Sequence, residues 1–215
     1  MEGLSQEAIN IAGDKKLSKL IVLYDSNDIS LDGPLSLSTA ENEKERFEAA
    51  GWDYVKVTNG NSLEEIQKAI EIAQGTDKPT LIEIKTVIGY NTPDAGTNKV
   101  HGAALGAEKV AEARDAYGWE YDPFEYPAEV YDRFNQYVEE KKAAHDEWVK
   151  LFEKYGQEYP AEYAQLTTNM LDVTDLVDEY QTGDQIATRV ASSDVLQQLA
   201  KANPQFWGGA ADLAS

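Results

Sequence analysis

The side chains best suited to chemistry are densest in one short run near the start of the chain. Residues 24–33 read Tyr-Asp-Ser-Asn-Asp-Ile-Ser-Leu-Asp-Gly and follow the apolar segment 19–24. Oxygen ligands placed directly after a buried strand suit a hard cation and phosphate groups, because ligand turns in α/β proteins lie at the carboxyl ends of strands. The pattern predicts that the strand and loop of residues 20–33 hold a metal ion.

Three other interpretations of this loop compete with a metal site. An EF-hand does not fit, because, counted from Asp25, the fifth position is Ile29 and the twelfth is Ser36, where a glutamate is required. Asp25 could be a phosphatase-like aspartyl nucleophile after a strand, but no lysine-bearing context singles it out. An Asx-rich turn that only caps backbone groups is as good an interpretation as the metal loop. Composition alone leaves these last two alternatives open.

The elements that must position this loop alternate between helix and strand. Such alternation predicts an α/β fold, a parallel sheet with helices on both faces. The capping box Ser62-Leu-Glu-Glu65 marks the start of one helix. The expected helices are residues 1–13, 41–50 and 62–74, and the expected strands are residues 19–24, 52–57 and 79–87.

The second half of the chain has a different pattern. Residues 88–106 form a polar, glycine-containing stretch that is too long for a simple connector, and such loops are often functional. From Pro127 apolar residues recur at helical spacing through a long charged segment, which predicts a helix leading toward a second domain. A linker over 167–181, an amphipathic helix over 184–202 and a short strand at Phe206-Trp207 are expected to follow.

Composition limits the classes of function. The chain has 215 residues, 39 acidic against 19 basic, and a formal net charge of −20. Nucleic acid is therefore an unsuitable partner, because phosphate neutralisation needs Lys and Arg. Cysteine is absent, which excludes disulfides and thiolate chemistry, and no apolar run suits a membrane span or a signal peptide. We expect a cytoplasmic protein without a membrane partner.

Six segments, in this order, resemble transketolase over the whole chain. A lone Gly-Gly or His-Gly would mean little, but six segments in register are specific. They are Met-Glu-Gly-Leu-Ser-Gln-Glu-Ala at 1–8, the strand and loop at 19–33, Arg-Phe-Glu-Ala-Ala-Gly-Trp at 46–52, Val-His-Gly-Ala at 100–103, Ala-Thr-Arg at 187–189, and Gly-Gly-Ala-Ala-Asp-Leu at 208–213.

The resemblance implies a homodimeric enzyme of the pentose phosphate pathway that uses thiamine diphosphate and Mg²⁺, or Ca²⁺ or Mn²⁺. Such an enzyme transfers a two-carbon ketol unit from a ketose phosphate to an aldose phosphate. The implied organisation is the C-terminal part of a diphosphate-binding domain over 1–155, a linker over 156–183 and the beginning of a pyrimidine-binding domain over 184–215. The expected fold is thus an incomplete thiamine diphosphate-binding fold with a helical connection to a second α/β domain.

The resemblance also implies roles for individual residues of the metal loop. The Asn27 amide oxygen and the Ile29 backbone carbonyl correspond to metal ligands, and Asn27 also lies near the diphosphate. Leu31 corresponds to an apolar residue packed against the cofactor, although ordinary core packing is an equally good interpretation. The carboxylates of the loop are expected to shape the turn.

Other implied roles are spread along the chain. His101 corresponds to a catalytic residue that contacts the diphosphate and the bound sugar, where a donor can stabilise developing negative charge. Arg189 corresponds to the arginine that binds the substrate phosphate, a task suited to a planar bidentate donor. Asp212 corresponds to a cofactor-binding carboxylate, and Glu2 and Glu7 to residues of the dimer interface.

Several parts that the resemblance implies are absent from these 215 residues. The Gly-Asp-Gly motif with the third metal ligand is expected just before Met1, which corresponds to an internal methionine of the family. The glutamate that activates the aminopyrimidine and the third domain are also absent. We therefore expect an internal fragment that is inactive alone. Two alternatives are a dihydroxyacetone synthase-like enzyme and a non-catalytic binding or dimerisation module of the same fold.

Overall fold

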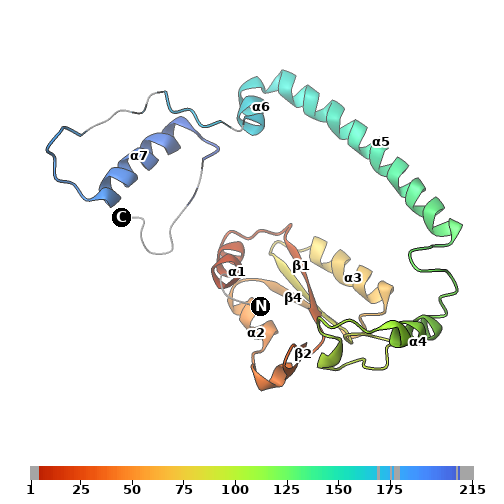
Figure 1. Ribbon diagram of the computed structural model, residues 1–215. Helices are drawn as coiled ribbons and strands as arrows, with labels where there is room; N and C mark the ends of the chain where they lie inside the picture. The colour runs from red at the N-terminus through yellow and green to blue at the C-terminus, as the bar shows by residue number, and fades with distance from the viewer. Residues whose placement is uncertain (1–4, 169, 175, 177–179, 207, 209–215) are drawn as a thin grey trace. The chain divides into compact units, whose positions relative to one another are not determined.

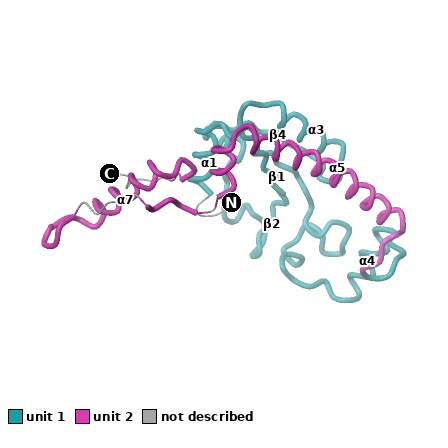
Figure 2. The backbone as a smooth tube through the Cα atoms, turned by 90° about the horizontal axis from the view of Figure 1, so that it is seen from above, with its two compact units in different colours: residues 1–123 teal, residues 124–215 magenta. Residues whose placement is uncertain are grey.

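The computed structural model describes residues 5–168, 170–174, 176, 180–206 and 208. Its backbone divides into two compact units, Met1–Pro123 and Phe124–Ser215, coloured separately in Figure 2. Unit 1 contains all the described strands. Each unit is described by itself below.

A three-stranded parallel sheet forms the centre of unit 1 (Figure 1). Its strands are β1 (Ile21–Ser26), β4 (Asp53–Val57) and β5 (Thr80–Lys85), in the order β1-β5-β4. Ile21 and Asp53 both pair with Thr80, so the three strands start level and end at a common edge. The first five residues of β5 are buried, as a parallel strand covered on both faces requires.

Helices cover both faces of this sheet. Helices α1 (Ser5–Asp14) and α2 (Glu43–Ala49) cover one face, where Phe47, Trp52 and Leu81 belong to one buried cluster. Helix α3 (Leu63–Gln74) covers the other face, where its alanines pack in a second buried cluster with Ile82. The parallel α/β sheet with helices on both faces, predicted from the sequence, is confirmed.

Local signals explain where helix α3 begins. The Ser62 side chain accepts a hydrogen bond from the Glu65 backbone N–H at 3.2 Å, which satisfies one of the unpaired donors of the first turn. The predicted start of this helix is therefore correct, and its end at Gln74 agrees as well.

Two irregular segments leave the carboxyl ends of β1 and β5. The segment after β1 folds into a small hairpin of β2 (Ile29–Ser30) and β3 (Gly33–Pro34), followed by the short helix η1 (Leu35–Leu37). The segment after β5 runs to Gly106 as a long loop that contains the one-turn helix η2 (Asn98–Val100). Helix α4 (Ala107–Tyr117) comes next.

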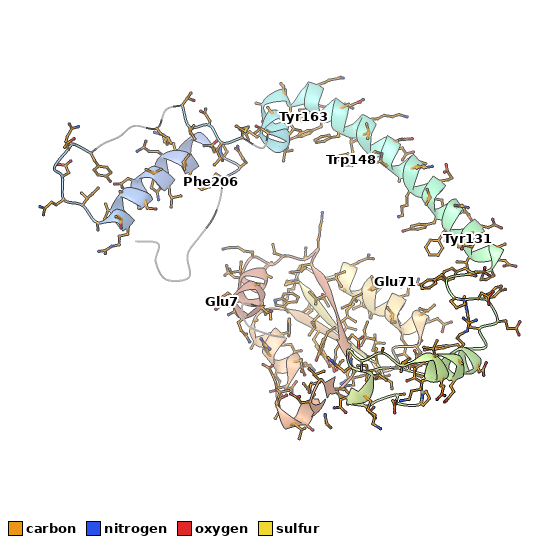
Figure 3. All side chains as sticks on the ribbon, viewed as in Figure 1. Glu7, Glu71, Tyr131, Trp148, Tyr163 and Phe206 are labelled. Atoms are coloured by element: carbon orange, nitrogen blue, oxygen red, sulfur yellow. The ribbon has the colours of Figure 1, made fainter. Side chains whose placement is uncertain are left out.

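Unit 2 is helical in the part that the structure describes. Helix α5 (Ala128–Glu158) is followed after one residue by α6 (Pro160–Thr167). The two helices contact each other through aromatic rings: the ring centroid of Phe152 on α5 lies 4.8 Å from that of Tyr163 on α6. Within α5, Trp148 stacks on Phe152 with ring centroids 5.0 Å apart; Trp148 and Tyr163 are labelled in Figure 3. The long helix expected from Pro127 is confirmed. The break at Pro160 was not predicted.

Helix α7 (Thr188–Ala202) starts later than the sequence predicted. The expected start at residue 184 is wrong, because the Asp184 carboxylate instead accepts a hydrogen bond from the Gln181 backbone N–H at 2.7 Å and closes a turn. The short strand expected at Phe206-Trp207 includes a residue outside the described part of the chain. Among the described residues, no helix is both long and apolar enough to cross a membrane.

Candidate functional site

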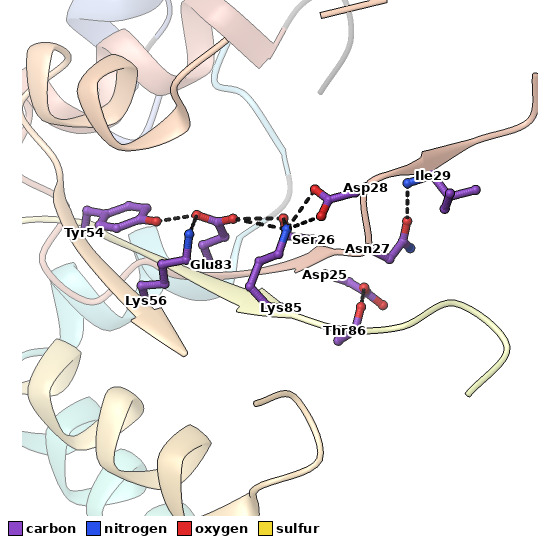
Figure 4. A network of polar contacts seen from close by, with 10 residues as sticks. All are labelled: Asp25, Ser26, Asn27, Asp28, Ile29, Tyr54, Lys56, Glu83, Lys85 and Thr86. Carbon is purple, nitrogen blue, oxygen red and sulfur yellow. Dashed lines mark hydrogen bonds and ion pairs between the residues drawn. The ribbon is translucent and has the colours of Figure 1, made fainter. Parts of the chain in front are cut away.

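The loop after β1 holds Asn27 and Ile29 close together. The Asn27 amide oxygen accepts a hydrogen bond from the Ile29 backbone N–H at 3.1 Å (Figure 4). Between them Asp28 has a φ of 62°, in the left-handed region that residues other than glycine rarely adopt. This Asx turn shows that the asparagine shapes the loop as well as presenting an amide oxygen.

Two carboxylates near the end of β1, Asp25 in the strand and Asp28 in the loop, make side-chain contacts. Asp25 accepts a hydrogen bond from the Thr86 hydroxyl, which comes from the residue after β5. Both carboxylate oxygens of Asp28 lie 2.7 Å from the Lys85 ammonium. Asp28 therefore joins the loop to the end of β5, and Asp25 joins the end of β1 to the residue after β5.

His101 lies at the end of η2, in the long loop after β5. Its backbone N–H donates to the Asn98 carbonyl at 3.1 Å, and the Asn98 side-chain amide donates to the Leu31 carbonyl at 3.2 Å. One asparagine thus links the segment of His101 to the loop of Asn27 across 67 residues of sequence. The structure brings Asn27, Ile29, Leu31 and His101 to one region of unit 1.

Ion pairs fix the long loop at its outer side. The Lys109 ammonium on α4 donates to the Asp94 carboxylate, and Lys99 lies 3.7 Å from the same group. The hydrogen bond from Lys109 lowers the pKa of Asp94 below its usual value, and the charges of Lys109 and Lys99 help it to outweigh the opposing effect of burial. The segment that carries His101 is therefore attached both to α4 and to the loop after β1.

A buried carboxylate that the sequence analysis did not select lies beside the site. Glu83 on β5 is only 6% exposed and accepts hydrogen bonds from the Tyr54 hydroxyl and, at 2.9 Å, from the Ser26 hydroxyl (Figure 4). Lys56 lies 3.6 Å from its carboxylate and Lys85 lies 4.0 Å away. Its signal in the sequence was a single acidic residue inside an apolar strand, which needs buried partners.

These partners determine the charge state of the network. Burial raises the pKa of Glu83, but the hydrogen bonds from Tyr54 and Ser26 and the two lysines outweigh burial, so the net effect lowers the pKa. Burial raises the pKa of Tyr54, and the adjacent Glu83 raises it further. Glu83 is thus held as a carboxylate, and Tyr54 as a neutral donor.

The remaining predicted site residues lie on α1, in unit 2, or outside the described residues. Glu7 is exposed on α1 (Figure 3), and Arg189 is exposed in the first turn of α7, in unit 2. Glu2 and Asp212 lie outside the described residues. The dimer-interface, phosphate-binding and Asp212 assignments therefore stay predictions.

The donor set decides which cation could fit the loop after β1. No group of three or more His, Cys, Asp or Glu side chains that could hold a metal lies among the described residues. The amide oxygen of Asn27 has two lone pairs, of which the Ile29 N–H occupies one. An amide and a backbone carbonyl suit a hard cation such as Mg²⁺, which completes its shell with phosphate oxygens and water. The residues present therefore fit part of a metal–diphosphate site.

Comparison with known proteins gives the class of domain first. A family model described as the thiamine diphosphate binding domain of transketolase matches residues 1–174. Two solved structures share the fold: transketolase from Leishmania mexicana, with a TM-score of 0.90 and 35% identity over 100% of this chain, and a transketolase from Pichia stipitis in complex with sedoheptulose-7-phosphate, with a TM-score of 0.88 and 34% identity over 99% of it. These matches cover 34% and 33% of the two solved chains.

Curated relatives then identify the family. A transketolase from Streptococcus pyogenes is 48% identical over 220 residues, which is all of this chain and 30% of that protein. A transketolase from Bacillus subtilis is 47% identical over 223 residues, again all of this chain and 33% of the relative. The chain belongs to the transketolase family, and it spans about a third of the length of the relatives it matches.

Proposed function

We propose that the chain supplies one half of the thiamine diphosphate and metal site of a transketolase, with Mg²⁺ as the bound cation. When bound, thiamine diphosphate supplies the electron sink for cleaving a carbon–carbon bond. The protein binds, orients and stabilises charge around it. Ca²⁺ and Mn²⁺ are alternative cations, because the same oxygen ligands suit them.

The proposed roles come from the family resemblance, and contacts within unit 1 support them. The Asn27 amide oxygen and the Ile29 carbonyl are the metal ligands, and Leu31, whose side chain is largely exposed, covers the cofactor. His101 hydrogen-bonds the diphosphate and the bound sugar. The observation that carries this proposal is the Asn98 side chain, which joins the His101 segment to the Leu31 carbonyl at 3.2 Å.

The activity proposed for the whole protein is transfer of a two-carbon ketol unit between sugar phosphates. Transketolase structures from Pichia stipitis are complexes with sedoheptulose-7-phosphate, fructose-6-phosphate and xylulose-5-phosphate, which supports sugar phosphates as substrates. Arg189 would bind the substrate phosphate, and Asp212 would lie near the cofactor. Glu2 and Glu7 would lie at the interface of a homodimer.

Several finer features stay predictions. The domain limits at residues 155 and 183 are among them, and residue 155 lies within α5. The cytoplasmic location and the place in the pentose phosphate pathway also stay predictions. We further propose that the 215 residues alone have no transketolase activity, because they lack the third metal ligand and the activating glutamate that the family resemblance implies.

Calorimetric titration of the 215-residue chain with thiamine diphosphate at saturating Mg²⁺ tests the site. We expect saturable binding that depends on Mg²⁺, and loss of one amide ligand in Asn27→Ala should weaken the binding about tenfold or more. Asn135→Ala is the matched control, since Asn135 is exposed on α5. This variant should bind like the unsubstituted chain.

Three outcomes separate the alternatives. Binding lost in Asn27→Ala and kept in Asn135→Ala supports the metal–diphosphate site. A shallow response without saturation in the unsubstituted chain contradicts the site and favours a non-catalytic scaffold. Turnover of sugar phosphates by the isolated chain would contradict the proposed inactivity.

A further inference from the structure

The backbone at Asp28 determines how the two proposed metal ligands face one another. Asp28 lies between Asn27 and Ile29, so its φ and ψ angles, together with those of Ile29, determine the direction of the Ile29 carbonyl relative to the Asn27 amide. Its φ of 62° is unfavourable for a residue with a Cβ atom. The Asx turn of Asn27 supports this conformation from within the loop, and a contact from outside the loop can stabilise it further.

Lys85 makes the contact that can do so. Its ammonium lies 2.7 Å from each carboxylate oxygen of Asp28 and 3.1 Å from the Ser26 hydroxyl. The Lys85 side chain is 28% exposed, so the pair is partly withdrawn from water although Asp28 itself faces solvent. The contact joins the last residue of β5 to the loop across 57 residues of sequence.

The ammonium is itself held in place from inside the sheet. The buried Glu83 carboxylate lies 4.0 Å from the Lys85 ammonium, and the Ser26 hydroxyl contacts both groups. Figure 4 shows the resulting line of contacts from Tyr54 through Glu83 and Lys85 to Asp28. The Lys85 ammonium, held at the end of the central strand β5, thus contacts the Asp28 carboxylate of the loop.

We propose that Lys85 is a positioning residue for the metal loop: it holds Asp28 in the left-handed conformation and thereby keeps the Asn27 amide oxygen and the Ile29 carbonyl directed at one cation. This role rests on the proposed metal site. The cost of left-handed backbone and the gain from a partly exposed ion pair are similar in size, so loss of the pair is enough to change the population of the loop.

Glycine at position 28 separates this role from simple stabilisation. Glycine adopts a φ of 62° without a steric cost, whereas alanine does not. Asp28→Ala should therefore disorder the Asn27–Ile29 turn, and Asp28→Gly should keep it. Because Asp28 is exposed, neither substitution disturbs the buried core.

Hydrogen exchange at the Ile29 N–H, measured by NMR without any ligand, reports directly on the hydrogen bond that closes the Asn27–Ile29 turn. We expect exchange about tenfold faster in Lys85→Met and in Asp28→Ala, while the Ala73 N–H in α3 stays protected. In the Asp28→Gly background, Lys85→Met should change the exchange rate of the Ile29 N–H by less than about twofold, because the Lys85–Asp28 ion pair is already absent. Lys56→Met is the matched control, because Lys56 forms its ion pair with Glu83, whereas the ion pair of Asp28 is with Lys85.

A second measurement connects the turn to the metal. In the presence of thiamine diphosphate, the apparent Mg²⁺ affinity should fall about tenfold in Lys85→Met, and Asp28→Gly should restore most of this loss. Unchanged Ile29 exchange in both Lys85→Met and Asp28→Ala would overturn the proposal. An equal effect of Lys85→Met in the Asp28→Gly background would overturn it as well.

The two experiments distinguish failure of the proposed metal site from failure of the proposed role of Lys85. If the unsubstituted chain takes up no thiamine diphosphate with Mg²⁺, the proposed function fails, whereas the exchange data still decide whether Lys85 orders the turn. If Lys85→Met loses Ala73 protection through unfolding, Asp28→Ala alone decides the same question.

Discussion

The two units of the chain bury their apolar side chains to very different extents. In unit 1 two clusters of buried residues lie on opposite faces of the sheet, and Phe47 is only 1% exposed. In the described part of unit 2, long helices carry exposed aromatic residues, among them Phe134 at 66% and Trp148 at 54% (Figure 3). The only buried residue there is the polar Asn203, at 2% exposed.

This difference indicates where the stability of the chain originates. Burial of apolar surface is the main favourable contribution to folding, and unit 1 has most of it. Unit 2 relies on hydrogen bonds within helices and on aromatic contacts along one surface. Unit 1 therefore holds its proposed site on a rigid sheet, while local opening should be easier in unit 2.

The same substitution in both units gives the largest expected contrast. Phe47→Ala should lower the free energy of unfolding by about 3–5 kcal/mol, because it leaves a cavity beside Trp52, whose ring lies 5.1 Å away. Phe134→Ala should change it by less than about 0.5 kcal/mol, because the side chain is already exposed. Urea denaturation followed by tryptophan fluorescence measures both. Comparable losses in the two variants would mean that the exposed face of α5 is covered in solution.

A smaller effect is expected at the buried polar residue of unit 2. The Asn203 side chain donates to the carbonyls of Asp172 and Leu199, each at 2.9 Å, and accepts from the Asp172 N–H at 2.6 Å. Asn203→Ala leaves these groups without their partner and should cost about 1–3 kcal/mol locally. Trypsin cleavage after Lys201 should become faster, while the exposed Asn135→Ala keeps the original rate. An unchanged rate of trypsin cleavage in both variants would show that the hydrogen bonds of Asn203 do not stabilise unit 2.

The sequence predicted the parts of the fold that depend on local patterns. Strand β1 and helix α3 followed from an apolar run and a capping box, which act over a few residues. The start of α7 was missed because Asp184 can cap a turn as readily as a helix, and the choice was made by its contact with Gln181. The break between α5 and α6 was not predicted, because a proline such as Pro160 can begin a helix as readily as it ends one.

The candidate site was predicted less completely than the fold, because several of its contacts join residues that are far apart in the sequence. The roles proposed for Asn27, Ile29 and His101 come from the family resemblance, because short motifs carry that resemblance. The Lys85–Asp28 pair and the Asn98 link to Leu31 join residues 57 and 67 positions apart, so no local pattern could reveal them. Only the acidic residue inside β5 gave a signal, because a buried charge requires partners.

The smallest predicted effect concerns the pH dependence of the network in unit 1. The pKa of Glu83 lies below its usual value of 4.5 in the folded chain, because the hydrogen bonds and lysines around the carboxylate outweigh burial. The unfolded chain therefore binds the proton first as pH falls. The stabilisation from ionised Glu83 is complete above about pH 5 and is lost as pH falls through the folded pKa.

Comparison with Glu83→Gln isolates this contribution, since glutamine does not titrate. The difference in unfolding free energy between the unsubstituted chain and the variant should be about 1 kcal/mol at pH 7 and should shrink between about pH 5 and pH 3. Urea denaturation at pH 7, 5 and 3.5 measures it, and Glu71→Gln on the exposed surface of α3 is the matched control (Figure 3). A difference that stays constant with pH would mean that Glu83 does not hold its charge through these contacts. A difference that grows in acid would mean that the pKa of Glu83 is raised in the folded chain. Glu83 would then not be a stable carboxylate that positions the Lys85 ammonium beside the metal loop.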